Sequence, residues 1–149
     1  MEDAIRHHTN FNFETTLGAN TIPTLLREAA ESGLLVHMYY VGLESPEMHV
    51  RRVASRVQKG GHSIPEGKIR QRYESSPRNL ISLWPALHRV VLFDNSADPD
   101  DDGMVEPLRI LRMEAGLIVE CLPDDEVPAW AREIVAAARQ FDAACRKRA

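Results

Sequence analysis

Hydrophobic and polar residues alternate along this chain in patterns that predict strands and helices in turn. Residues 12–16 (NFETT) predict a short strand that ends in polar groups. Residues 22–32 have the apolar spacing of a helix, with Thr21 as its cap and Gly33 as its stop. Residues 34–41 (LLVHMYYV) form an almost continuous apolar run, which is typical of a parallel strand buried on both faces. Residues 89–93 (RVVLF) predict another strand.

Two helices and a tight connection are predicted between these strands. Ser45-Pro46 starts the first helix, and Gly60-Gly61 ends it. Ser63 and Glu66 have the spacing of a capping box for the second helix. Two prolines are expected to kink or interrupt that helix, namely Pro77 and Pro85.

The last third of the chain predicts a hairpin and a helix. Residues 108–114 and 117–122 are two apolar runs joined at Ala115-Gly116, and an amphipathic helix follows over residues 128–145. An acidic loop over residues 97–107 precedes them. The whole pattern predicts an α/β fold with a mostly parallel sheet, in which ligands bind beyond the carboxyl ends of the strands. Three polar clusters follow predicted strands there: Glu14-Thr15-Thr16, Gly42-Leu43-Glu44 and Asp94-Asn95-Ser96.

Composition and charge limit the classes of protein to which this chain can belong. The 149 residues suit one domain, and their net charge of -4 argues against binding of nucleic acid through the overall field. The chain has no apolar run of about 20 residues and no signal segment at its start, which predicts a cytoplasmic protein with no membrane partner. Cys121 and Cys145 lack the spacing of metal ligands.

Positive charge is concentrated around the two glycines, within residues 51–78. Arginine binds phosphate oxygens through a planar fork that stays charged. Arg52 and Arg56 share one helix face, and Lys68 and Arg72 repeat that spacing after the glycines. The pattern indicates either a flap that closes over phosphate or a solvated basic face paired with glutamates. Arg56 and Arg72 are the first candidates, with Arg52 and Arg70 as the next.

Several motifs together resemble a known family. FETTL, YVGLESPEMHVRRV, RVASRVQKGGHSIPE, IRQRYESSPRNL and FDNS occur here in an order that resembles the zeta-toxin-like P-loop small-molecule kinases. The resemblance covers about residues 11–96. It implies a three-layer P-loop kinase-like fold, with ATP and Mg²⁺ as cofactors and a small-molecule acceptor such as a nucleotide sugar. It also implies toxin–antitoxin biology, with an antitoxin or self-association as the partner interaction.

The resemblance assigns roles to residues of this chain. Glu14, Thr15 and Thr16 are expected to bind the substrate, and residues 51–78 to form a lid. Arg56, Arg70 and Arg72 are expected to act in catalysis, and together with Arg52 to bind phosphate. Asp94 and Asn95 are candidates for nucleotide contacts, and the alternative for them is a turn that leaves the strand.

The family's glycine-rich loop GxxxxGK[ST] and its catalytic aspartate are missing before the FETTL segment. The ten residues ahead of Phe11, MEDAIRHHTN, contain neither glycine nor lysine. Without the phosphate-binding loop, its lysine and the aspartate, the chain alone is expected to be inactive. It is therefore interpreted as an N-terminally truncated domain lacking the first strand. The alternative is a non-catalytic relative that binds an anion or a partner.

Other polar groups have simpler structural explanations. His62 beside the glycines caps a helix or touches phosphate, and His7-His8 has no third ligand at a useful spacing. Residues 98–109 imitate the start of a calcium loop, but Arg109 stands where the bidentate glutamate belongs. No metal site is therefore predicted.

Overall fold

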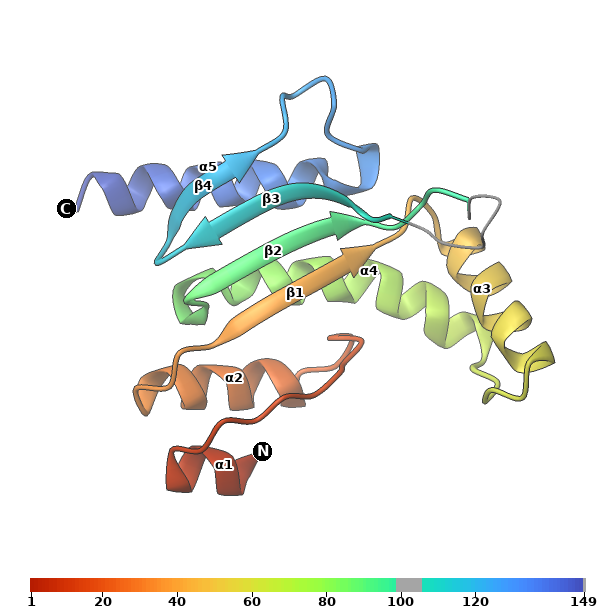
Figure 1. Cartoon of the computed structure of the whole chain (residues 1–149), viewed down its shortest axis with the longest axis horizontal. Helices are drawn as coiled ribbons and strands as arrows, with labels where there is room; N and C mark the ends of the chain where they lie inside the picture. Colours follow the sequence, from red (N-terminus) through yellow and green to blue (C-terminus); the bar gives the residue numbers. More distant parts are fainter. Residues whose placement is uncertain (99–105, 149) are drawn as a thin grey trace.

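The computed structural model describes residues 1–98 and 106–148, and it confirms the α/β class. Figure 1 shows a four-stranded sheet in the order β1-β2-β3-β4, backed by helices. The strands are β1 (His37–Gly42), β2 (Arg89–Asp94), β3 (Leu108–Glu114) and β4 (Leu117–Cys121). The helices are α1 (Glu2–His7), α2 (Thr21–Glu31), α3 (Pro46–Gln58), α4 (Glu66–Ser82), η1 (Trp84–Ala86), η2 (Ala129–Ala131) and α5 (Arg132–Arg146).

The prediction of a mostly parallel sheet is wrong. β1 and β2 are parallel, with Tyr39 opposite Val91, whereas the β2–β3 and β3–β4 pairs are antiparallel. The turn Ala115-Gly116 has positive φ angles of 48° and 81°, which match a two-residue hairpin turn. Such a turn reverses the chain at once, so β4 runs antiparallel to β3, as the hairpin pattern predicted.

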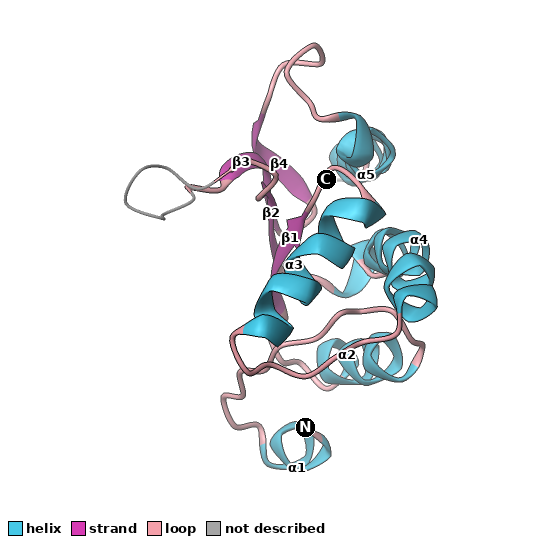
Figure 2. Cartoon of the chain, turned by 90° about the vertical axis from the view of Figure 1, so that its right-hand side faces the viewer, coloured by secondary structure: helices cyan, strands magenta, loops and turns pink. Residues whose placement is uncertain are grey.

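The described residues form two layers rather than three. Figure 2 shows α2, α4 and α5 on one side of the sheet, and α3 lies beyond the carboxyl ends of β1 and β2 in Figure 1. β1 stands at the edge of the sheet, and its side chains alternate between the two faces. Met38 and Tyr40 are half-buried, whereas Tyr39 and Val41 are exposed. The predicted burial of this strand on both faces is therefore wrong, because no helix covers its second face.

One hydrophobic core joins the sheet to the helices. Its fully buried side chains come from α4, the sheet, α5 and the residue after α4: Leu80, Leu83, Val90, Leu92, Ile110, Leu111 and Ile134. In the part of the chain that the structure describes, no helix combines the length and the apolar character that a membrane span requires.

The ends of α3 follow the sequence prediction. Ser45 Oγ accepts a hydrogen bond from Met48 N at 3.2 Å, and Pro46 occupies the first turn. At the other end, Gly60 adopts φ 90° and its N–H donates to Val57 O at 3.0 Å, while Gly61 N donates to Arg56 O at 2.9 Å. This pair of bonds is the usual glycine cap of a helix. The glycines therefore end α3 in a fixed, hydrogen-bonded turn.

Two predicted helix starts, and the predicted effect of one proline, differ from the structure. Asn20, not Thr21, precedes the first turn of α2, and Pro65, not Ser63, precedes α4. Pro77 lies inside α4, which continues to Ser82, and Pro85 falls in η1 beyond the end of that helix. Pro77 therefore does not break α4.

The predicted strand at residues 12–16 is absent. The segment is exposed and pairs with no strand, and Thr15 Oγ1 accepts a hydrogen bond from Leu17 N at 3.0 Å. This local bond makes a turn in place of a ladder. It is followed by Leu17, which is buried with φ 51°.

Candidate functional site

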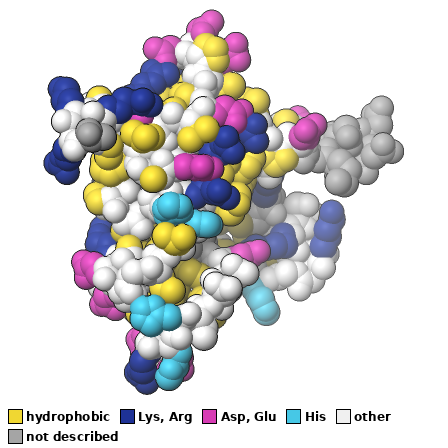
Figure 3. Space-filling view, turned by 60° about the vertical axis from the view of Figure 1, so that its left-hand side comes forward, with side chains coloured by type: hydrophobic (Ala, Val, Ile, Leu, Met, Phe, Trp, Pro, Cys, Tyr) yellow, Lys and Arg dark blue, Asp and Glu magenta, His cyan; other side chains and the backbone are white. Residues whose placement is uncertain are grey.

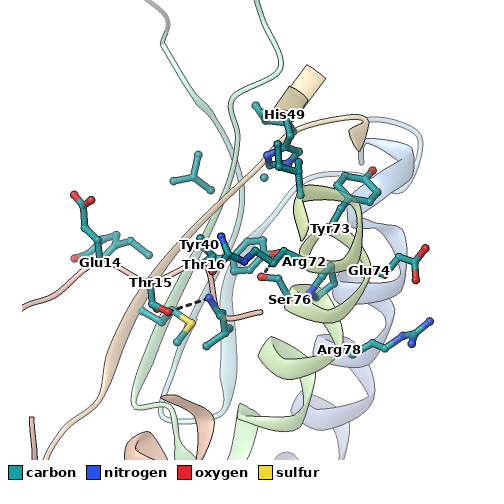
Figure 4. Close-up of a pocket in the computed structure, with 18 of the residues that line it drawn as sticks. Glu14, Thr15, Thr16, Tyr40, His49, Arg72, Tyr73, Glu74, Ser76 and Arg78 are labelled. Atoms are coloured by element: carbon teal, nitrogen blue, oxygen red, sulfur yellow. Dashed lines mark hydrogen bonds between the residues drawn. The ribbon is translucent and has the colours of Figure 1, made fainter. Parts of the chain in front are cut away.

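A large cleft runs along the free edge of β1 and contains the residues that the sequence analysis put first. Its volume is about 1280 Å³. Its walls come from residues 11–17, β1, α3, α4 and the start of α5, and Figure 4 shows part of this lining. The lining includes Glu14, Thr15, Thr16, Arg56 and Arg72. The structure thus brings together residues that are far apart in the sequence.

Arg56 and Arg72 line this cleft from two different helices. Arg56 belongs to the last turn of α3, and Arg72 to the middle of α4. Within residues 1–98 and 106–148, neither guanidinium group forms an ion pair with a carboxylate. No carboxylate of the described residues therefore neutralises them at the cleft, and their binding of a phosphate stays a prediction.

The segment before α2 is fastened to α4 by its backbone carbonyls. Ser75 Oγ donates to Gly18 O at 3.0 Å, and Asn79 Nδ2 donates to Leu17 O at 2.7 Å. Sequence reasoning missed these anchors, although polar residues four apart on one helix face are a recognisable signal. They hold Thr15 and Thr16 at the cleft. In Figure 4 the Glu14 carboxylate points away from Arg72.

Gly18 lets the stem of Arg72 pass close to the backbone. A Cβ at Gly18 would lie 2.5 Å from Arg72 Cγ, which is too close for two carbon atoms. We expect Gly18→Ala to shift Arg72 and to destabilise the fold by about 1–3 kcal/mol, the usual cost of overpacking. The measurement is urea unfolding of both proteins.

Gly67→Ala is the matched control for this substitution. A Cβ at Gly67 meets nothing within 4 Å, and the residue lies in the first turn of α4. Alanine favours a helix over glycine, so this variant should be as stable as the parent or more stable, by up to about 1 kcal/mol. Equal effects of the two substitutions would contradict the packing role of Gly18.

Aromatic residues form the wall of the cleft near the end of β1. Tyr40 stacks on Trp130 with ring centroids 6.4 Å apart, and its hydroxyl donates to Ser76 Oγ at 3.0 Å. Burial raises the pKa of Tyr40 despite this hydrogen bond, so the phenol stays neutral at physiological pH. Trp130 also packs against Gly42, where a Cβ would lie 2.1 Å from the indole ring. The wall is thus a neutral, tightly packed surface.

His49 adds a titratable ring to the cleft beside Tyr73. The two rings meet edge to face, with centroids 5.6 Å apart. Burial lowers the pKa of His49, and the charge of Arg52 lowers it further. His49 is therefore neutral near pH 7, and the positive charge of the cleft comes from its arginines.

Arg70 is engaged by carboxylates and does not contribute to the cleft lining. Its guanidinium lies 2.6 Å from Glu47 of α3 and 2.7 Å from Glu66 of α4. The hydrogen bond from Arg70 lowers the pKa of Glu47, and Glu47 in turn raises the pKa of Arg70. In this arrangement Arg70 ties α3 to α4, which is the glutamate-paired alternative left open by the sequence.

Arg52 is also used within the fold. Its Nη2 donates to the backbone oxygens of Asn95 at 2.6 Å and Ala97 at 3.3 Å. These bonds join α3 to the loop after β2. The roles predicted for Arg52 and Arg70 in phosphate binding, and for Arg70 in catalysis, remain predictions that these positions do not support.

Asp94 and Asn95 form the turn that leaves β2. Asp94 Oδ1 accepts hydrogen bonds from Trp130 Nε1 at 3.1 Å and Ser96 N at 3.2 Å, and also from Ser96 Oγ. Ser96 Oγ accepts from Glu44 N at 2.7 Å, so the loops after β1 and β2 are in contact. Asp94 and Asn95 do not belong to the cleft lining, and this geometry favours the turn over the nucleotide contact.

The part of the chain that the structure describes contains no cluster of side chains suited to bind a metal ion. No group of three His, Cys, Asp or Glu side chains there has the arrangement to hold an ion. Most of the acidic loop predicted over residues 97–107 lies outside the described residues, and so does the core of the calcium-loop imitation.

Comparison with known proteins gives one relative and no family. An uncharacterized protein of Haemophilus influenzae is 39% identical over 70 residues, which are 47% of this chain. The chain spans about half the length of this curated relative, with the match covering 50% of it. No family model and no solved structure matches the chain. The resemblance to zeta-toxin-like kinases therefore stays a prediction.

Proposed function

We propose that this chain carries the acceptor-binding and lid part of an ATP-dependent small-molecule phosphotransferase of zeta-toxin-like type. In this proposal Arg56 and Arg72 bind a phosphate group in the cleft, and Thr15 and Thr16 contact the acceptor. Glu14 belongs to the same segment, and a carboxylate there would orient a substrate hydroxyl. The proposal retains the P-loop kinase-like fold for the complete protein.

The observation that carries the proposal is the meeting of Arg56 and Arg72 in one cleft. The two residues are separated by the glycine cap and by the start of α4, yet both line the same cavity. Preorganised cations without carboxylate partners stabilise the charge that spreads over a phosphoryl group in transfer. A basic face on a single helix would not explain why arginines of two separate helices line one cavity.

The chain's own residues suit an anion better than a complete Mg·ATP. The cleft offers three guanidinium groups, from Arg56, Arg72 and Arg78, together with hydroxyls, aromatic rings and the carboxylates of Glu14, Glu74 and Glu133. Its lining in the described residues includes no glycine-rich loop with a lysine. When bound, ATP and Mg²⁺ would supply the phosphoryl group and neutralise its charge. In this proposal their cradle belongs to a part of the protein other than these 149 residues.

Titration calorimetry with two ligands tests the proposal. We expect the 149-residue chain to bind inorganic pyrophosphate in the cleft and to gain little or nothing from the adenosine and Mg²⁺ of Mg·ATP. Tight binding of Mg·ATP with no binding of pyrophosphate would contradict the proposal that this chain holds the phosphate and acceptor sites but not the nucleotide cradle. Joining the chain to a strand and a GxxxxGK[ST] loop in frame should then produce phosphotransfer, if the proposal holds.

The guanidinium groups that line the cleft also suit a second function. The same cleft serves a non-catalytic module that binds an anion or a partner, with an antitoxin as one such partner. Binding of pyrophosphate would be unchanged in this case. An assay of the chain joined to the GxxxxGK[ST] loop distinguishes the two functions. The binding module would show no phosphotransfer even with the loop restored.

A further inference from the structure

One face of α4 carries both an arginine of the cleft and the groups that fasten the segment before α2. Arg72, Ser75 and Asn79 share this face, because they are spaced by three and four residues along the helix. Ser75 Oγ donates to Gly18 O at 3.0 Å, and Asn79 Nδ2 donates to Leu17 O at 2.7 Å. Two consecutive carbonyls of the segment are therefore held by the helix that carries Arg72.

Leu17 has a backbone conformation that depends on these bonds. Its φ angle is 51°, in the left-handed region that residues other than glycine rarely adopt. The side chain of Leu17 is 3% exposed, and its N–H donates to Thr15 Oγ1 at 3.0 Å. A strained backbone persists only where its surroundings hold it. The bonds from Ser75 and Asn79, together with the burial of Leu17, hold it here.

The fastened backbone lies directly against the stem of Arg72. A Cβ placed on Gly18 would lie 2.5 Å from Arg72 Cγ, 3.2 Å from its Cβ and 3.4 Å from its Cδ. Three carbons of the side chain thus run along the backbone of Gly18. Because the rotamer of the stem decides where the guanidinium group lies, a movement of Gly18 changes the position of this group in the cleft.

The position of an arginine decides whether it binds a ligand. Figure 3 shows basic side chains spread over the surface among acidic and hydrophobic ones, so positive charge alone does not mark a site. In Figure 4 Arg72 and Arg78 point to opposite sides of α4. A side chain that is held in its binding position before the ligand arrives loses less conformational freedom on binding. The contact with Gly18 holds Arg72 in this way.

We infer that Ser75 and Asn79 are positioning residues of the anion site, which act on Arg72 through residues 17–18. The inference rests on the proposed function, because it needs an anion in the cleft. It adds that the affinity for this anion depends on how firmly the segment is fastened to α4. The same segment carries the two threonines proposed to contact the acceptor. Acceptor and anion therefore change each other's affinity by the same factor.

Titration with inorganic pyrophosphate measures the effect on binding. Asn79→Ala and Ser75→Ala each remove one bond to the segment, and each should lower the affinity about threefold to tenfold. Ser75→Thr retains the hydroxyl and should recover most of the affinity. Asn20→Ala is the matched control at the end of the same segment, since Asn20 makes no side-chain capping bond to α2. This control should bind pyrophosphate as the parent chain does.

Two further variants separate positioning from a general loss of stability. Val135 in α5 is 2% exposed and does not line the cleft. Val135→Ala should destabilise the fold, yet the folded protein should retain its affinity for pyrophosphate. In a chain that already carries Arg72→Ala, adding Asn79→Ala should cause no further loss. Residues that act through one contact are not additive, whereas independent effects add.

Hydrogen exchange of the Leu17 amide tests the fastening itself. This amide donates to Thr15 Oγ1, and Asn79→Ala should speed its exchange about threefold or more without any ligand. Pyrophosphate should slow the same amide in the parent chain but not in the Arg72→Ala variant, because the inferred link runs through Arg72. Ser75→Ala replaces Asn79→Ala in these tests if circular dichroism shows that Asn79→Ala does not fold.

Three results would overturn the inference while the proposed function stands, since the parent chain binds pyrophosphate in each of them. The first is full affinity in both Asn79→Ala and Ser75→Ala. The second is an equal loss from Asn79→Ala with and without Arg72→Ala. The third is exchange of the Leu17 amide at one rate in the parent chain and in Asn79→Ala. A parent chain that does not bind pyrophosphate would overturn both proposals.

Discussion

Replacing Arg56 and Arg72 together by alanine is expected to lower the affinity for pyrophosphate by about tenfold or more. A hydrogen bond to a charged group contributes about 1.5–3 kcal/mol, and the open cleft screens part of this energy. Both side chains line the cleft, so the double variant removes the cations that the proposal needs. Titration calorimetry at low ionic strength is the measurement.

The control removes two charges from the same helices but outside the cleft. Arg51 of α3 and Lys68 of α4 are exposed and do not line the cavity. Arg51→Ala with Lys68→Ala should retain most of the affinity, because only the general field changes. Equal losses in the two double variants would mean that overall charge binds the anion, and the assigned site would be wrong.

The largest expected effect on stability comes from Leu92→Ala. Leu92 is 0% exposed in the central strand β2, and it belongs to the core between the sheet and the helices. Truncation of a buried leucine leaves a cavity and costs about 2–5 kcal/mol. This is a large part of the total stability of a domain of this size. Urea unfolding followed by circular dichroism gives the value.

Leu35→Ala is the control for Leu92→Ala, with the same atoms removed at the surface. Leu35 is 67% exposed, so its truncation should change the free energy of unfolding by less than about 0.5 kcal/mol. A cost below about 1 kcal/mol at Leu92 would show that the core collapses around the gap. It would then be wrong to treat the sheet and helices as tightly packed at this position.

Local signals in the sequence predicted the elements well. Ala115-Gly116 between two apolar runs predicted the hairpin, and Gly60-Gly61 predicted the end of α3, because both depend on backbone angles that few residues adopt. Ser45-Pro46 predicted the start of α3 for a similarly local reason. The sequence left open whether Pro77 kinks or interrupts its helix, and the structure shows that α4 continues past it to Ser82.

Features that depend on neighbours in space were harder to predict. The run LLVHMYYV gave no sign that β1 stands at an edge with Tyr39 and Val41 exposed, because apolar composition says nothing about what covers each face. Arg56 and Arg72, the first candidates from the sequence, line one cleft, and the ligand that they would share stays a prediction. The sequence ranked Arg70 behind them but still gave it a role in catalysis, because its partners Glu47 and Glu66 become visible only when α3 and α4 pack together.

Trp130 gives the molecule an internal optical reporter. The chain contains two tryptophans, of which Trp84 is 5% exposed in the core. Trp130 instead lines the cleft, stacks on Tyr40 and donates its indole N–H to Asp94. Its fluorescence emission therefore responds to ligand binding in the cleft and to changes in the loops that follow β1 and β2. Trp84 contributes a steady background, so native fluorescence follows ligand entry without any attached dye.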